Sequence, residues 1–62
     1  MVLHFISKSH NIVILKKHFI ALFEQNNELL LVYIAVDRNN KETVVTVEIE
    51  TPLIDIIRQM NT

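Results

Sequence analysis

One apolar stretch decides the fold of this 62-residue chain: Leu29-Leu30-Leu31-Val32-Tyr33-Ile34-Ala35-Val36. Successive side chains of a β-strand point to opposite faces of a sheet, and here both sets are apolar. We therefore expect a strand over 29–36 whose two faces are both covered. A helix of the same chain can cover one face, and a partner subunit is the simplest source of the second cover. The alternative is a central strand enclosed within the monomer.

A second strand follows after a polar turn, Asp37-Arg38-Asn39-Asn40-Lys41. Residues 43–50 alternate, with Thr and β-branched apolar residues at odd positions and a more polar set at even positions, which is typical of an antiparallel strand. The two strands predict a hairpin. Asn39-Asn40 would carry its turn, because asparagine tolerates positive φ best after glycine. Asn26-Asn27 is a candidate for the same role one turn earlier.

The N-terminal part of the chain leaves two solutions open. β-branched and aromatic residues predict a strand over 2–6, followed by a polar turn over 7–11. In the next stretch apolar residues recur at helical spacing, while Ile12-Val13-Ile14 is β-branched and favours a strand. Residues 11–24 are therefore either one helix, or a short strand over 12–15, a bend over 16–18 and a strand over 19–24.

Thr51-Pro52 predicts the start of a C-terminal helix, because the threonine side chain can accept from an unpaired amide and proline at the first helical position loses no needed donor. The apolar stripe of this helix is expected to pack on the sheet. The stripe is Leu53, Ile56, Ile57 and Met60, and the polar face is Asp55, Arg58, Gln59 and Thr62. The predicted fold is α+β, with short antiparallel strands in two hairpins and one C-terminal helix packed on the sheet. It forms a single domain over 1–62; the alternative is β-α-β-β-α with a helix at about 11–24.

Two residue types are missing, and each absence excludes a class of function. Without glycine the chain has neither a P-loop nor a dinucleotide-binding fingerprint. Without cysteine it has no disulfide, thiolate nucleophile, zinc finger or iron–sulfur site. No cofactor is expected.

The N-terminus, Met1 to Lys8, carries no positive leader and no small-residue cleavage site, so it does not read as a signal peptide. The longest apolar run, 29–36, is far shorter than the roughly 18 residues that a membrane helix needs. The sequence predicts a cytoplasmic protein that does not enter a membrane.

Charge is divided unevenly along the chain. Residues 1–23 contain three lysines and no acid, whereas 24–62 contain three basic and seven acidic residues. The basic-patch candidates are Lys8, Lys16, Lys17 and His18, with His10 nearby. Such a patch could bind phosphates, but three lysines are few, so nucleic acid is possible and not favoured. A solvated edge, or a basic surface that meets an acidic one on a neighbouring subunit, is the preferred interpretation.

No catalytic or metal site is expected from the sequence. His4, His10 and His18 lack the close spacings of metal ligands. Ser9 and His10 are adjacent in sequence, which gives no reason to expect a nucleophile–base pair, because such a pair is defined by spatial geometry and an oxyanion hole. Glu48 and Glu50 are expected on one strand face, with Asp55 in the first turn of the helix. Paired catalytic carboxylates need a cleft, and a solvent-facing strand does not provide one. We therefore expect no enzymatic activity.

The order of these segments resembles a known pattern. A short hairpin, a strand ending near "I-x-x-I-E", a second hairpin and a helix occur in the first part of LytTR DNA-binding domains and in the small FlbD and RemA-like bacterial families. The positions that match are Ile20, Phe23 and Glu24 in the strand-ending motif, and Val45, Val47, Thr51, Leu53 and Ile57 in the last strand and helix. The resemblance implies two strands rather than a helix over 11–24, and a regulatory function.

Half of the residues are apolar, and 23 of them are Val, Ile or Leu, which is generous for so small an interior. We expect self-association, and a non-catalytic regulatory or accessory module that binds another macromolecule, with a protein as partner. The assembly candidates are Leu29, Leu31, Tyr33, Leu53, Ile57 and Met60. Tyr33 is either an interior residue or an interface anchor. The alternatives are a DNA-binding regulator of LytTR or RemA-like type, a motility accessory protein, and a phage-type inhibitor of a host protein.

Overall fold

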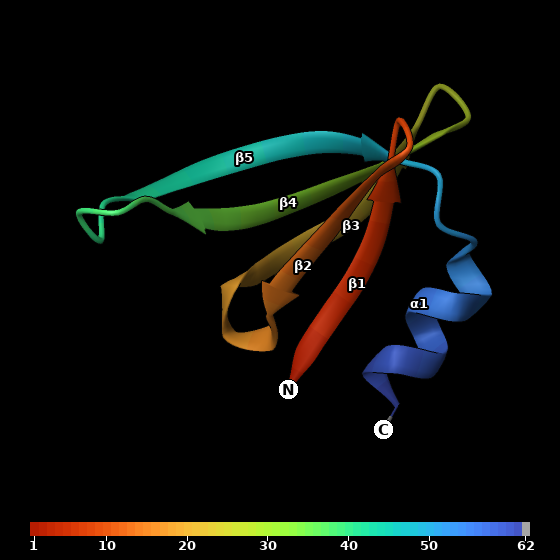
Figure 1. Ribbon diagram of the computed structural model, residues 1–62. Helices are drawn as coiled ribbons and strands as arrows, with labels where there is room; N and C mark the ends of the chain where they lie inside the picture. Colours follow the sequence, from red (N-terminus) through yellow and green to blue (C-terminus); the bar gives the residue numbers. More distant parts are fainter. Residues whose placement is uncertain (62) are drawn as a thin grey trace.

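The computed structural model describes residues 1–61 and shows a small α+β fold (Figure 1). Its elements are β1 (Val2–Ser7), β2 (His10–Leu15), the 3-10 helix η1 (Lys16–His18), β3 (Phe19–Gln25), β4 (Glu28–Val36), β5 (Glu42–Ile49) and α1 (Leu53–Met60). β1 and β2 form an antiparallel hairpin, and β3, β4 and β5 form a three-stranded antiparallel sheet with β4 in the middle. The predicted fold class is confirmed. Thr62, assigned above to the polar face of the helix, lies outside the described residues.

The ambiguous stretch 11–24 forms two strands separated by one turn of 3-10 helix, so the alternative with a helix there is wrong. The β-branched run in β2 pairs with β1 along its whole length, from Val2↔Leu15 to Ser7↔His10. A strand propensity that is weak by itself is stabilised by this cross-strand pairing. The register of β3 on β4 shifts between Phe19 and Ala21, where the strand carries an irregularity.

Without glycine, the turns place other residues at positive φ. They are Lys8 (47°), Ser9 (70°), Asn26 (52°), Asn27 (64°) and Asn40 (60°). The β1–β2 and β3–β4 turns each have two consecutive residues of this kind, as tight hairpin turns require. Asn26-Asn27 therefore carries its turn as predicted.

The β4–β5 turn is built differently from the other two. Only Asn40 has positive φ there, and Asn39 does not. The Asp37 carboxylate accepts hydrogen bonds from the amides of Asn39 (2.8 Å) and Lys41 (2.9 Å). Asp37 thus fixes the loop by a side-chain interaction that asparagine spacing alone does not reveal.

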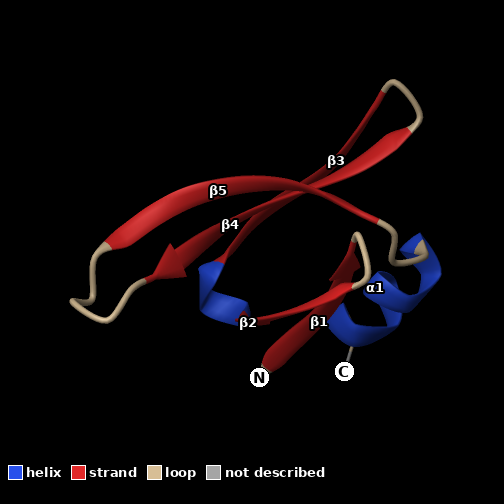
Figure 2. Ribbon diagram, turned by 45° about the horizontal axis from the view of Figure 1, so that its top comes forward, coloured by secondary structure: helices blue, strands red, loops and turns tan. Residues whose placement is uncertain are grey.

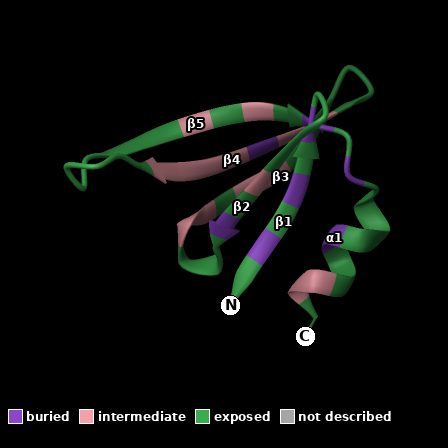
Figure 3. Cartoon of the chain, in the orientation of Figure 1, coloured by how far each residue is buried: buried purple, intermediate pink, exposed green. Residues whose placement is uncertain are grey.

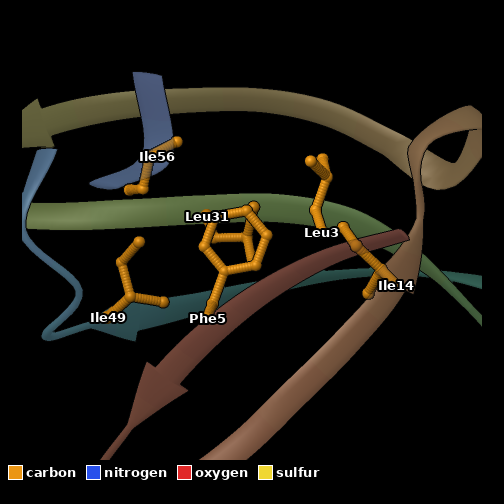
Figure 4. Packing of buried hydrophobic residues seen from close by; sticks show 6 residues of the cluster. All are labelled: Leu3, Phe5, Ile14, Leu31, Ile49 and Ile56. Atoms are coloured by element: carbon orange, nitrogen blue, oxygen red, sulfur yellow. The ribbon is translucent and has the colours of Figure 1, made fainter. Parts of the chain in front are cut away.

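The core lies between the two sheets and α1 (Figure 4). Its six buried apolar side chains are Leu3, Phe5, Ile14, Leu31, Ile49 and Ile56. They come from β1, β2, β4, β5 and α1, so every one of these elements contributes to a single cluster. Full burial of each such side chain stabilises the fold by about 1.5–3 kcal/mol relative to exposure. In Figures 1 and 2 the β1–β2 hairpin and α1 lie on the same side of the three-stranded sheet.

The free edge of β1 is closed by Glu50 and Thr51, which lead into α1, and by Gln59 within α1. Its outward amides at His4, Ile6 and Lys8 donate to Gln59 Oε1 (2.7 Å), Thr51 Oγ1 (2.7 Å) and Glu50 Oε1 (3.0 Å). Gln59 Nε2 also donates to the His4 carbonyl (2.9 Å), and the Glu50 amide donates to the Ile6 carbonyl (2.7 Å). Three side-chain oxygens therefore take the place of a neighbouring strand.

This arrangement corrects the predicted helix start. Pro52, not Thr51, is the N-cap residue of α1, and no side chain caps the first turn. The Thr51 hydroxyl oxygen is occupied by the amide of Ile6 instead. A strand-edge amide brought close by the tertiary fold competes for the acceptor that local sequence assigns to the helix.

The hairpin of β4 and β5 extends beyond the rest of the molecule (Figure 1). β3 pairs with β4 only as far as Phe19↔Tyr33, whereas β4 and β5 continue to Val36↔Glu42. Residues 34–36 and 42–44 therefore form a two-stranded arm. Within residues 1–61, no helix has the length and apolar character needed to cross a membrane.

Candidate interaction surfaces

Large apolar side chains remain exposed on three parts of the described chain. They outnumber the six that are buried, so the interior does not absorb the apolar half of the sequence. The exposed set is Met1, Val2, Ile6, Val13, Leu15, Ile20, Phe23, Val36, Val44, Leu53, Ile54 and Ile57. They lie on the three-stranded sheet, on the β1–β2 hairpin and on α1.

Seven apolar residues that are exposed or half-buried lie on the side of the three-stranded sheet that faces away from the core; Figure 3 shows the exposed and half-buried stretches of β3, β4 and β5. The even positions of β4 point to this side, and the register adds their neighbours on β3 and β5. We call this the outer face; it consists of Ala21, Phe23, Leu30, Val32, Ile34, Val36 and Val44. Val44 is 65% exposed, and no outer-face residue belongs to the core cluster or packs against it. The described residues therefore leave this face uncovered.

The assembly candidates on β4 lie on the opposite side. Leu31 is 0% exposed, and Leu29 and Tyr33 pack against the core cluster. Leu31 thus offers no surface to a partner, and the choice of the odd positions was wrong for it. The reason is physical: both sets of side chains are apolar, so alternation cannot say which one the rest of the chain covers.

The helix candidates divide in the same way. Met60 packs against the core cluster beside the buried Ile56. Leu53 and Ile57 are exposed, as is Ile54, which the predicted stripe did not include. The apolar part of α1 is therefore wider than its contact with the sheet, and one edge of it faces solvent.

A smaller apolar surface lies on the β1–β2 hairpin. The register pairs Val2 with Leu15, His4 with Val13 and Ile6 with Asn11, so these six side chains share one side. We call this the hairpin face; all six residues are exposed. The opposite side of the same hairpin carries Leu3, Phe5 and Ile14 into the core.

The basic-patch candidates do not form one cluster. Lys8 lies in the β1–β2 turn, and Lys16, Lys17 and His18 form η1 at the far end of β2. The six residues of β2 separate the two positions by roughly 20 Å. His10 is at the Lys8 end, so only Lys16-Lys17-His18 remains contiguous. The single patch expected from sequence is thus split in two.

Acidic groups accompany the outer face. Glu28 and Glu48 lie at one end of it, since Glu48 pairs with Leu30 and Glu28 is two positions before Leu30 on β4. Glu42 lies on the arm opposite Val36. None of the residues in β3, β4 or β5 is lysine or arginine. The outer face is therefore apolar along its centre and acidic at its Leu30 end, whereas the turn next to the arm carries Arg38 and Lys41 beside Asp37 and Glu42.

Two hollows in the described part of the surface border candidate residues. One, of about 320 Å³, lies between the end of β2, η1 and the arm, and is lined by Val13, Leu15, His18, Tyr33, Ile34 and Val36 among others. Tyr33 is half-buried in this hollow. It is therefore neither a fully buried interior residue nor a fully exposed interface anchor, the two roles considered from sequence. The other, of about 260 Å³, lies between the hairpin and α1, with His4, Thr51, Asp55 and Gln59 in its wall. Thr51 and Gln59 already bond the edge of β1.

Among residues 1–61, no three His, Cys, Asp or Glu side chains gather closely enough to hold a metal ion. Comparison with known proteins yields no match to a protein family, to a curated protein or to a solved structure. The resemblance to the LytTR, FlbD and RemA-like families stays a prediction. The geometry therefore directs attention to surfaces rather than to a reaction centre.

Proposed function

We propose that this chain is a non-catalytic binding module that works by associating with a macromolecule through its outer face, and first with copies of itself. The observation that carries the proposal is the uncovered apolar face of the three-stranded sheet. Contiguous apolar patches on soluble proteins commonly mark interaction sites. The regulatory or accessory role expected from sequence would be exerted through this contact.

The energetics support a partner for this face. Fully burying a Val, Leu, Ile or Phe side chain contributes about 1.5–3 kcal/mol, and the outer face has seven apolar residues that are exposed or half-buried. A domain of this size buries only about 60% of the surface that its unfolded chain exposes, less than a larger domain does, and is marginally stable alone. Because a partner that binds only the folded state stabilises it by mass action, association through the outer face would also support the fold.

Nucleic acid binding finds less support. A contiguous group of Lys16, Lys17 and His18 neutralises few phosphates, and each contact contributes only about one to the slope of affinity against salt. Lys8 is too far away to join it and its amide lies against Glu50. A protein surface therefore fits the outer face better than a phosphate backbone does.

The test is sedimentation velocity over a concentration series up to the millimolar range. The 7.3 kDa chain should increase in mass with concentration. Val44→Glu places a charge in the outer face and should hold the protein at the mass of one chain. Ile54→Glu is the matched control, because Ile54 is 54% exposed on α1, away from the outer face. A parent protein that stays at the mass of one chain throughout would refute the proposal.

A further inference from the structure

The molecule has two apolar surfaces on separate elements, the hairpin face and the outer face. The core lies between the hairpin and the three-stranded sheet, and the two surfaces approach each other only at the η1 end, where Val13, Leu15, Ile34 and Val36 border one hollow. Both surfaces consist of strand side chains that alternate with core residues, as Val13 does with Ile14 and as Val32 does with Leu31. The two surfaces differ in charge.

The hairpin face ends in a positively charged turn. Leu15 is followed directly by Lys16 and Lys17 in η1, and residues 1–23 contain no acid. At the opposite end, near Lys8, acids from the C-terminal half are close: Glu50 accepts the Lys8 amide, and Asp55 lines the hollow beside Ile6. The uncompensated positive charge of this surface is therefore at η1.

The outer face has the opposite sign. Glu28 and Glu48 are exposed at its Leu30 end, and the three strands contain no basic residue. Packing two outer faces with their Leu30 ends together would bring these carboxylates into contact, and like charges in contact are unfavourable. The nearest cations of the same hairpin, Arg38 and Lys41, lie in the β4–β5 turn at the opposite end. A surface that is apolar and basic suits the outer face better. The hairpin face has this composition.

We propose that the occupant of the outer face is the hairpin face of a second copy, with Lys16 and Lys17 against Glu28 and Glu48. This inference rests on the proposed function and names its partner. The apolar residues next to η1, Val13 and Leu15, then lie on the Phe23, Leu30 and Val32 part of the outer face. Each copy offers one surface of each kind, so the contact is heterologous and passes from copy to copy until it closes into a ring or continues as a filament.

The contact is modest in size. Two strands of six residues cover a projected area of roughly 10 by 20 Å, which is small beside the ~800 Å² per partner of standard interfaces. Association should therefore depend on concentration, and its charged part should weaken as salt rises, because the Debye length falls from about 10 Å at 0.1 M to about 3 Å at 1 M.

Charge exchange between two variants tests the proposal. One variant carries Lys16→Glu and Lys17→Glu, and the other carries Glu28→Lys and Glu48→Lys. In either one alone the contact joins like charges, so each should sediment as a single chain. In a 1:1 mixture the acidic turn of the first meets the basic outer face of the second, and the remaining native surfaces also match, so oligomers should return. Circular dichroism of each variant checks that the fold is retained.

A further pair of single variants is the matched control: Glu28→Lys should weaken association, whereas Glu24→Lys has the same net charge but changes a position that lies off both faces, opposite Leu29. Glu24→Lys should associate as the parent does. The proposal is overturned if the mixture stays monomeric while the parent associates, if Lys16→Glu with Lys17→Glu associates as well as the parent, or if oligomers form only when duplex DNA is added. A parent that never associates instead refutes the proposed function itself.

Discussion

The two sides of β4 consist of the same kinds of residues and have opposite environments. Leu31 is completely buried against the hairpin and α1, whereas its neighbour Val32 lies on a face that no described part of the chain covers. Position in the strand, not hydrophobicity, separates them. An apolar side chain stabilises this fold on one side of the sheet and is available to a partner on the other.

The largest effect that separates the two sides is expected from truncating the core side. Leu31→Ala should lower the free energy of unfolding by about 2–5 kcal/mol, because it leaves a cavity among Phe5, Ile49 and Ile56. Leu30→Ala is the matched substitution on the outer face and should cost much less, since Leu30 is only partly buried. Urea unfolding of dilute protein measures both. Equal losses would mean that the two sides are not distinct.

A smaller effect is expected where the core side depends on the closed edge of β1. Thr51→Val keeps the shape of the side chain but removes the acceptor of the Ile6 amide, and an amide left unsatisfied costs about 1–3 kcal/mol. Thr46→Val makes the same change on the outer-face side of β5, opposite Val32, where Thr46 is exposed; in dilute protein it should change stability by less than about 0.5 kcal/mol.

Thermal unfolding of these two variants at equal low concentration compares them. If Thr51→Val proves as harmless as Thr46→Val, the edge of β1 does not depend on the hydroxyl, and the account of why α1 begins without a side-chain cap is incorrect.

The smallest change in stability is expected in the hairpin turns, which lie on neither side of the three-stranded sheet. Ser9 has φ 70° in the β1–β2 turn, a region that disfavours residues with a Cβ and suits glycine. Ser9→Gly should stabilise the protein by up to about 1 kcal/mol. Asn27→Gly, at the matching position of the β3–β4 turn, should gain less, because asparagine already tolerates this conformation. Denaturant midpoints measure the difference, and a larger gain at Asn27 would contradict the explanation.

The strand boundaries were accessible from sequence because turn residues and β-branched runs are local signals. The stretch 12–15 with its bend at 16–18 and strand at 19–24 matches β2, η1 and β3 closely. The missing side-chain cap of α1 and the distance of Lys8 from Lys16 could not be predicted from local signals. Thr51 bonds a residue 45 positions away, and the separation of Lys8 from Lys16 depends on β2 being fully extended.

The existence of the outer face could be predicted from sequence, but its position on the sheet could not. The apolar run 29–36 shows that one side of β4 has no cover within so short a chain, and the structure leaves such a side open. Sequence could not show that the uncovered side is the one with Val32 and Ile34, because the residues on both sides are apolar. The hairpin face was missed although its signal was present: Val2, Ile6, Val13 and Leu15 alternate with the core residues of the same two strands.

Methyl NMR over a dilution series tests the central claim most directly, because it observes the two sides of the sheet in one molecule. We expect the resonances of Val32 and Val44 to shift or broaden as concentration rises, while those of Leu31 and Ile49 stay in place. Resonances of the outer face that do not respond at any concentration, or a response confined to the exposed residues of α1, would contradict it.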